Sequence, residues 1–126
     1  MDLSRINKVK EKLHKASLLG MYVTNLTNVR YLTGFTGSAG SLLIIGDSQH
    51  FFTDGRYISQ SKEQVKDCEI HIVGGAHYLE IKTKNLIPAN AKIGFESLAM
   101  NVDAYDQLTQ ALSHCDWEKT SMIVEK

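Results

Sequence analysis

The sequence is poor in proline and cysteine and has no excess of either charge. Among 126 residues there are one proline, two cysteines, 14 basic and 14 acidic side chains. Nucleic-acid binders need a basic surplus to neutralise phosphates, and anionic membranes attract the same surplus. No apolar run reaches the length of a membrane span, about 20 residues. We therefore expect neither a nucleic-acid partner nor a membrane partner.

The two cysteines, Cys68 and Cys115, form no C-x-x-C pair. A chain of this length can bury a core without disulfides, so we interpret both as free thiols in a reducing compartment. Residues 1–5 lead into a charged amphipathic stretch that lacks the apolar centre of a signal peptide. These features predict a cytoplasmic protein.

The length is that of one domain, and hydrophobic periodicity predicts alternating helices and strands. Asp2 or Ser4 would cap the first helix, and Gly20 would end it. The order, with one hairpin, predicts a single α/β domain over 1–126, with a mixed sheet flanked by helices. The expected helices are 3–19, a short one ending at 32, 56–65, 77–86 and one capped by Asn101 or Asp103; the expected strands are 21–24, 41–45, 49–53, 68–73, 91–95 and 117–124.

Two details of this pattern concern the core and the end of the chain. In the segment 56–65, Tyr57, Ile58 and Val65 are the candidate core contacts. Residues 122–126 stop in the middle of an apolar pattern, without a polar fade-out. We therefore expect the natural polypeptide to continue beyond Lys126.

A glycine-rich loop covers 34–40, with glycine at every third position. Dinucleotide-binding loops have the spacing G-x-G-x-x-G and are followed by a helix, whereas here a strand follows. No P-loop Gly-Lys-Ser/Thr occurs either. Tight turns with close backbone packing explain the glycines better. A free-standing module that binds a nucleotide or small molecule is therefore the weakest functional hypothesis.

The candidate catalytic and metal-binding residues also lack the spacing of known motifs. Ser38 does not lie in G-x-S-x-G, and His50 and Asp54 are near it only in sequence. His71 and His77 are separated by a strand end and two glycines, and no H-E-x-x-H is present. We expect no catalytic residue and no metal site within this chain.

The segment 53–57, Thr-Asp-Gly-Arg-Tyr, lies at a strand-to-helix junction. In one interpretation Asp54 is a helix cap, Gly55 a turn and Arg56 a surface ion pair. In the other, Arg56 is presented at the edge of the sheet to bind a carboxylate or a neighbouring subunit, a task that suits its planar fork. The residue pattern leaves both open.

Two segments taken together resemble a known family. "YLTGFTGSAGS" at 31–41 is followed, after a hairpin, by "FTDGRY" at 52–57, which resembles the N-terminal domain of the creatinase/prolidase/aminopeptidase P family. The structural motif residues carried by this resemblance are Tyr31, Gly34, Phe35, Gly37, Ser38, Gly40 and Gly55.

The resemblance implies a three-layer, ribonuclease-H-like fold and a place in a proline-specific metallopeptidase, an Xaa-Pro aminopeptidase or dipeptidase. In full-length relatives a pita-bread domain follows and holds two divalent metals, often manganese, through two Asp, one His and two Glu. That catalytic domain is absent from this chain, so no metal ligand can be carried over. The fragment alone is expected to be inactive.

The resemblance also implies a non-catalytic role in the parent enzyme. Such domains contribute subunit contacts in a homodimer or higher oligomer, pack on their own catalytic domain and limit access of Xaa-Pro peptides. Arg56 is the residue expected to reach a neighbouring active site, with Asp54 and Tyr57 as its supports. The alternative is a catalytically inactive protein-binding module of the same architecture.

Overall fold

A six-stranded mixed sheet forms the centre of the structure, a computed structural model that describes residues 3–120 and 123–124. The strand order is β4-β3-β2-β1-β5-β6. Only β2 among the described strands runs antiparallel to its neighbours, so the carboxyl ends of the others share one edge of the sheet. The strands are β1 (Gly20–Val23), β2 (Ser41–Ile45), β3 (Ser48–Thr53), β4 (Glu69–Ile72), β5 (Lys92–Glu96) and β6 (Asp116–Thr120).

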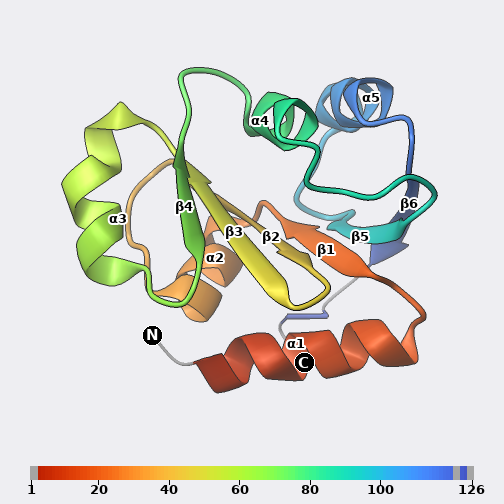
Figure 1. Cartoon of the computed structure of the whole chain (residues 1–126), viewed down its shortest axis with the longest axis horizontal. Coiled ribbons are helices and arrows are strands. Elements are labelled where there is room, and N and C mark those ends of the chain that lie inside the picture. The colour runs from red at the N-terminus through yellow and green to blue at the C-terminus, as the bar shows by residue number, and fades with distance from the viewer. Residues whose placement is uncertain (1–2, 121–122, 125–126) are drawn as a thin grey trace.

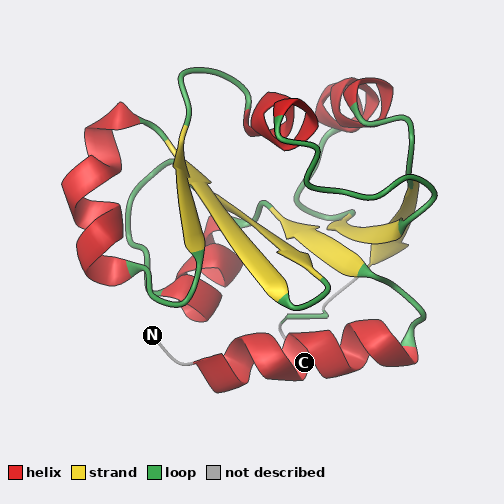
Figure 2. Cartoon of the chain, viewed as in Figure 1, coloured by secondary structure: helices red, strands yellow, loops and turns green. Residues whose placement is uncertain are grey.

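Helices cover both faces of the sheet, as Figures 1 and 2 show. One apolar cluster joins α1 and α2 to the sheet and includes Ile6 and Leu32, while a second joins α4 and α5 and includes Ile81 and Leu108. This arrangement confirms the predicted three-layer α/β fold. The helices are α1 (Leu3–Lys15), α2 (Leu26–Thr33), α3 (Ile58–Gln64), α4 (His77–Thr83) and α5 (Val102–Ala111), with a short 3₁₀ helix at Gly55–Tyr57.

The burial of the central strand β2 explains the continuous apolar run in its sequence. All its residues are buried, with Leu42 and Ile44 in the α1 cluster and Leu43 and Ile45 in the α4 cluster. A strand covered on both faces needs a continuous apolar run instead of an alternating one. The predicted bounds 41–45 of this strand are confirmed.

The helix α2 lies where a short helix ending at residue 32 was predicted, and local capping sets its bounds. The Asn25 side chain accepts a hydrogen bond from Thr27 N at 2.9 Å. Gly34 follows the last turn with φ of 84°, a left-handed conformation that glycine adopts without steric cost. These two signals lie within the segment itself, so sequence alone could locate the helix.

The predicted end of the first helix is wrong. The helix stops at Lys15, because Ser17 takes a left-handed φ of 61° and Leu18 N donates to Leu13 O at 2.8 Å. Gly20, predicted as the terminating glycine, is instead the first residue of β1. Of the predicted caps, Ser4 lies inside the helix and Asp2 lies outside the described residues.

Two further predictions are corrected. Ile58 is 43% exposed, whereas Val65 is buried as expected. Ile58 is the first residue of α3, after the 3₁₀ turn, and it does not belong to either apolar cluster. The last strand ends at Thr120 instead of 124, and Val124 packs beneath α1, whose Lys12 Nζ donates to Ile123 O. Residues 121–122 and 125–126, part of the predicted tail, lie outside the described residues.

Candidate functional site

The two motif segments lie at the same edge of the sheet. The loop 34–40 leads into β2, and the turn 54–57 follows β3. Because β2 and β3 are antiparallel, the start of one lies beside the end of the other. In α/β sheets, ligands commonly bind outside the carboxyl ends of the strands. We call the loop 34–40 and the turn 54–57 together the loop–turn site.

Direct contacts join the loop to the turn. Ser38 N donates to Tyr57 OH at 3.1 Å, and the hydroxyls of Ser38 and Tyr57 lie 2.7 Å apart. These hydrogen bonds lower the pKa of the Tyr57 hydroxyl. Thr53 Oγ1 donates to Ala39 O at 2.6 Å. The loop is therefore held on the end of β3 by side chains of the second motif.

Phe35 forms the floor of this site. Its ring is 1% exposed and lies 4.8 Å from the ring centroid of Phe51 and 5.3 Å from that of Tyr57. A Cβ on Gly37 would lie 2.3 Å from the Phe35 ring and 2.8 Å from the Tyr57 ring, and one on Gly40 would lie 3.1 Å from Phe35. Close approach of the loop to this ring explains its glycines physically, without a phosphate ligand.

Arg56 is an exposed residue of the loop–turn site. Asp54 caps the 3₁₀ helix and accepts from Arg56 N and Nε at 3.0 Å each, and from Nη2 at 2.8 Å. This hydrogen bonding holds the pKa of Asp54 below and that of Arg56 above their ordinary values. The guanidinium carbon lies 5.2 Å from the Tyr57 ring centroid.

The Arg56 side chain remains 67% exposed. Its Nη1 has no hydrogen-bond partner among residues 3–120 and 123–124. The fork is therefore oriented by Asp54 and Tyr57 yet can still donate to an incoming acceptor. A Cβ on Gly55 would meet no atom within 4 Å, so this glycine belongs to the turn and not to the packing.

Tyr31 is not part of the loop–turn site. It is 46% exposed, and Arg5 lies over its ring at 4.4 Å. Arg5 Nη1 also donates to the Tyr31 carbonyl at 2.9 Å. The start of the first motif thus contacts α1, whereas its Ser38 and Ala39 contact Tyr57 and Thr53.

A buried polar cluster beside this edge was missed by sequence reasoning. His77 Nδ1 lies 2.6 Å from Ser41 Oγ, which accepts from Tyr22 OH at 3.1 Å. Burial raises the pKa of Tyr22 to about 12 and lowers the pKa of His77, against a smaller opposing effect of Asp54. Ser41 is 3% exposed, so the hydroxyl is enclosed by packing.

Glu96 is a second polar residue that sequence reasoning missed. Its carboxylate, 7% exposed, accepts from Thr24 N at 2.8 Å, Asn25 N at 2.9 Å and Asn28 Nδ2 at 2.5 Å. It thereby joins the end of β5 to the start of α2. An acidic residue at the end of an apolar strand could have marked Glu96 as a candidate in the sequence. Its hydrogen-bond partners could not be identified in this way, because they lie far away in the sequence.

We expect the stability of the chain to fall as the pH drops below 6.5, partly because of His77. Since its pKa is lower in the folded chain than its ordinary 6.5, the unfolded chain binds the proton first. Stability from this residue is therefore complete above 6.5 and is lost towards the folded pKa. Urea unfolding of His77→Asn across this pH range should show a shallower loss than the original chain.

The control for this experiment is His14→Asn, which removes an exposed histidine on α1. Asparagine at 77 keeps an acceptor near the position of the imidazole Nδ1 and does not titrate. Equal pH slopes in the original chain and in His77→Asn would contradict the assignment.

The structure does not assemble the catalytic sets considered from sequence. Ser38 contacts Tyr57, His50 contacts His71, and Asp54 pairs with Arg56, so no Ser-His-Asp arrangement forms from them. In the described part of the chain, metal-ligating side chains converge at His50, Glu69 and His71. This is not the set of two Asp, one His and two Glu that the family resemblance implies, so the described residues do not fit a dinuclear centre.

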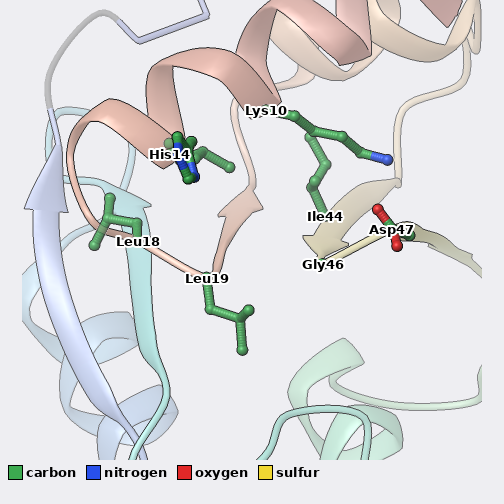
Figure 3. Close-up of a pocket in the computed structure, with 8 residues that line it drawn as sticks. Lys10, His14, Leu18, Leu19, Ile44, Gly46 and Asp47 are labelled. Carbon is green, nitrogen blue, oxygen red and sulfur yellow. The ribbon is translucent and has the colours of Figure 1, made fainter.

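A pocket lies elsewhere, between α1 and the turn that joins β2 to β3 (Figure 3). Lys10, His14 and Leu18 form one wall, and Ile44 and Asp47 form another. It is at the amino-end edge of β3, away from the loop–turn site. Lys10 Nζ already donates to Gln49 Oε1 at 2.6 Å. This pocket is therefore a gap under the helix and adds nothing to the site.

The fold matches a solved domain over nearly the whole chain. The N-terminal domain of the cytoplasmic peptidase PepQ from Mycobacterium tuberculosis superposes with a TM-score of 0.86 at 34% identity, covering 97% of this chain and 96% of that one. A family model, the creatinase/prolidase N-terminal domain, matches residues 5–126. The chain belongs to the creatinase/prolidase N-terminal domain family.

Longer relatives match over one part of their length. The uncharacterized peptidase YqhT of Bacillus subtilis is 36% identical over 124 residues, which is 97% of this chain and 35% of that protein. An Xaa-Pro dipeptidase from Bacillus anthracis has a TM-score of 0.88 at 29% identity, over 98% of this chain and 34% of that one. The chain thus spans about a third of these relatives. None of the helices described here is long and apolar enough to cross a membrane.

Proposed function

We propose that this chain is the non-catalytic N-terminal domain of a cytoplasmic, proline-specific metallopeptidase, an Xaa-Pro aminopeptidase or dipeptidase. Support comes from the family and from relatives named as an Xaa-Pro dipeptidase and, in pig, as Xaa-Pro aminopeptidase 2, which is 29% identical over 75% of this chain and 14% of that protein. The PepQ relative is described as cytoplasmic.

In this proposal the chemistry belongs to a second domain of the parent enzyme. That domain would hold two divalent metal ions, manganese being the expected species, and hydrolyse the bond before proline. The sequence that follows Lys126 in the gene tests this half of the proposal. Two Asp, one His and two Glu in family order support the peptidase, and their absence would favour an inactive protein-binding module.

The role of this chain would be to contribute subunit contacts and to limit the length of Xaa-Pro substrates at a neighbouring active site. The observation that carries this proposal is the Arg56 side chain, 67% exposed and oriented by Asp54, with Nη1 available as a donor. A planar guanidinium at the rim of an entrance can bind a carboxylate of a peptide or of a partner subunit.

Arg56→Ala in the parent enzyme should therefore lower kcat/KM on Xaa-Pro peptides about 10- to 100-fold. Loss of a hydrogen bond to a charged substrate group weakens binding by about that factor. Steady-state kinetics with peptides of increasing length, together with the oligomeric state from light scattering, measure the two proposed roles separately.

Arg56→Lys keeps the charge but removes the fork, so it should recover only part of the activity. Lys62→Ala, which removes an exposed cation from the neighbouring α3, is the matched control and should change little. Unchanged kcat/KM and unchanged assembly in Arg56→Ala would refute the proposed role of the residue.

A further inference from the structure

A group of three ligand-type side chains lies at the edge of the sheet, on the face covered by α4. His50 comes from β3, and Glu69 and His71 come from the edge strand β4. We call these residues the His-Glu-His cluster. Parallel pairing sets His50 opposite Glu69, while His71 stacks on Phe52 with ring centroids 4.9 Å apart. Glu69 begins β4 and His50 lies in the first half of β3, whereas Arg56 follows the carboxyl end of β3.

The three ligand atoms converge on one point. His50 Nδ1 lies 3.0 Å from His71 Nε2, His71 Nε2 lies 3.0 Å from Glu69 Oε2, and His50 Nδ1 lies 3.5 Å from that oxygen. Ligands of a tetrahedral zinc ion, at about 2.0–2.1 Å from the metal, are about 3.3 Å from one another. The three separations bracket this value.

Neutral hydrogen bonding does not satisfy the cluster. If both imidazoles direct N–H groups at Glu69, the two donors of His50 and His71 face each other at 3.0 Å. If His50 Nδ1 instead accepts from His71 Nε2, its lone pair faces the carboxylate at 3.5 Å. Either proton arrangement leaves one unfavourable contact. A cation at the centre would accept three lone pairs and leave none of these conflicts.

Two charged residues of α4, Glu80 and Lys84, lie beside the ring of His71. Its side chain is 1% exposed, and its other nitrogen, Nδ1, lies 3.7 Å from Glu80 Oε2 and 3.4 Å from Lys84 Nζ, both on α4. The Lys84 ammonium can only donate, so its contact with Nδ1 favours the tautomer whose proton is on Nε2. An ion bound at Nε2 requires that proton to move to Nδ1, where the Glu80 carboxylate at 3.7 Å is the nearby acceptor. Lys84 pairs with Glu80 at 3.1 Å, so its charge is partly neutralised there.

We propose that the His-Glu-His cluster binds one divalent transition-metal ion, with Zn²⁺ as the best fit. Two imidazole nitrogens and one carboxylate favour Zn²⁺ over Mg²⁺ or Ca²⁺, which prefer oxygen ligands. Glu69 is 64% exposed, so ions reach the cluster from solvent and a water molecule can take the fourth position. The bound ion joins the edge strand β4 to β3 and stabilises that edge.

Titration of the chain with ZnCl₂ against a chromophoric chelator at neutral pH tests this site. We expect one Zn²⁺ per chain and a higher unfolding temperature in its presence. Glu69→Gln and His50→Ala should each weaken binding about tenfold or more. Side-chain nitrogen NMR signals of His50 and His71 should shift on saturation, and Co²⁺ substitution should produce the visible absorption of a tetrahedral ion.

The matched control is His14→Ala, an exposed histidine outside the cluster, which should leave the affinity unchanged. Glu69 is exposed, so its amide variant should fold normally even if the loss of His50 perturbs the sheet. Glu80→Gln should weaken binding by a smaller factor through His71. Equal affinity of the original chain and Glu69→Gln, or histidine signals that do not move, would mean adventitious binding only and would overturn the proposal.

Discussion

Replacing Gly20 with alanine should destabilise the chain by about 3 kcal/mol or more, the largest effect we expect from adding one methyl group. A Cβ at this position would lie 2.2 Å from the carbonyl oxygen of Ile44 and 3.1 Å from the Cα of Ile45. Both contacts are backbone atoms of the paired strand β2, so neither can move without breaking the β1–β2 register. Urea unfolding followed by circular dichroism measures the loss.

Gly75→Ala is the matched control for this substitution. A Cβ on Gly75 would meet no atom within 4 Å, and its φ is not in the left-handed region. Alanine should therefore be neutral, or stabilising by up to about 1 kcal/mol, because it restricts the unfolded chain. Equal stability of Gly20→Ala and Gly75→Ala would show that the strands separate more easily than the structure indicates.

Replacing Phe35 with alanine should cost about 3–5 kcal/mol, the usual range for a buried phenylalanine. The ring is 1% exposed and contacts Phe51, Tyr57 and the backbone at Gly37 and Gly40. Its removal leaves a cavity directly beneath the loop–turn site. Chemical denaturation of the chain measures the stability, and kcat/KM of the parent enzyme measures the effect on the site.

Phe35→Leu fills part of the cavity and should lose less stability than the alanine variant. If the ring positions Arg56 through Tyr57, both variants should lower activity on Xaa-Pro peptides even under conditions where they are fully folded. Full activity in a folded Phe35→Ala protein would show that the loop–turn site does not depend on this floor.

Much of the secondary structure could be predicted, because its signals are local. The apolar run of β2 and the Asn25 and Asn101 caps lie inside or next to their own elements. The end of the first helix was missed, since Ser17 in a left-handed conformation carries no strong sequence signal. The end of the last strand was missed because Val124 is apolar yet packs under α1.

In the candidate site, too, contacts between near neighbours in sequence could be predicted and contacts between distant residues could not. Asp54 and Arg56 are two residues apart, so their ion pair could be anticipated from the sequence. The Ser41–His77 contact and the Glu96 contacts join residues 36 to 72 positions apart, and no local pattern announces them. Such pairs depend on which strands are neighbours, and propensities do not specify that.

The sequence by itself determined the class of this protein. Its motifs at 31–41 and 52–57 identified the family, and its balanced charge predicts that no nucleic acid is bound. Only the tertiary structure placed the loop on the Asp54 turn, since this needs the antiparallel register of β2 and β3. Only the parallel pairing of β3 with β4 brought His50, Glu69 and His71 together, because strand register sets which distant side chains share a face.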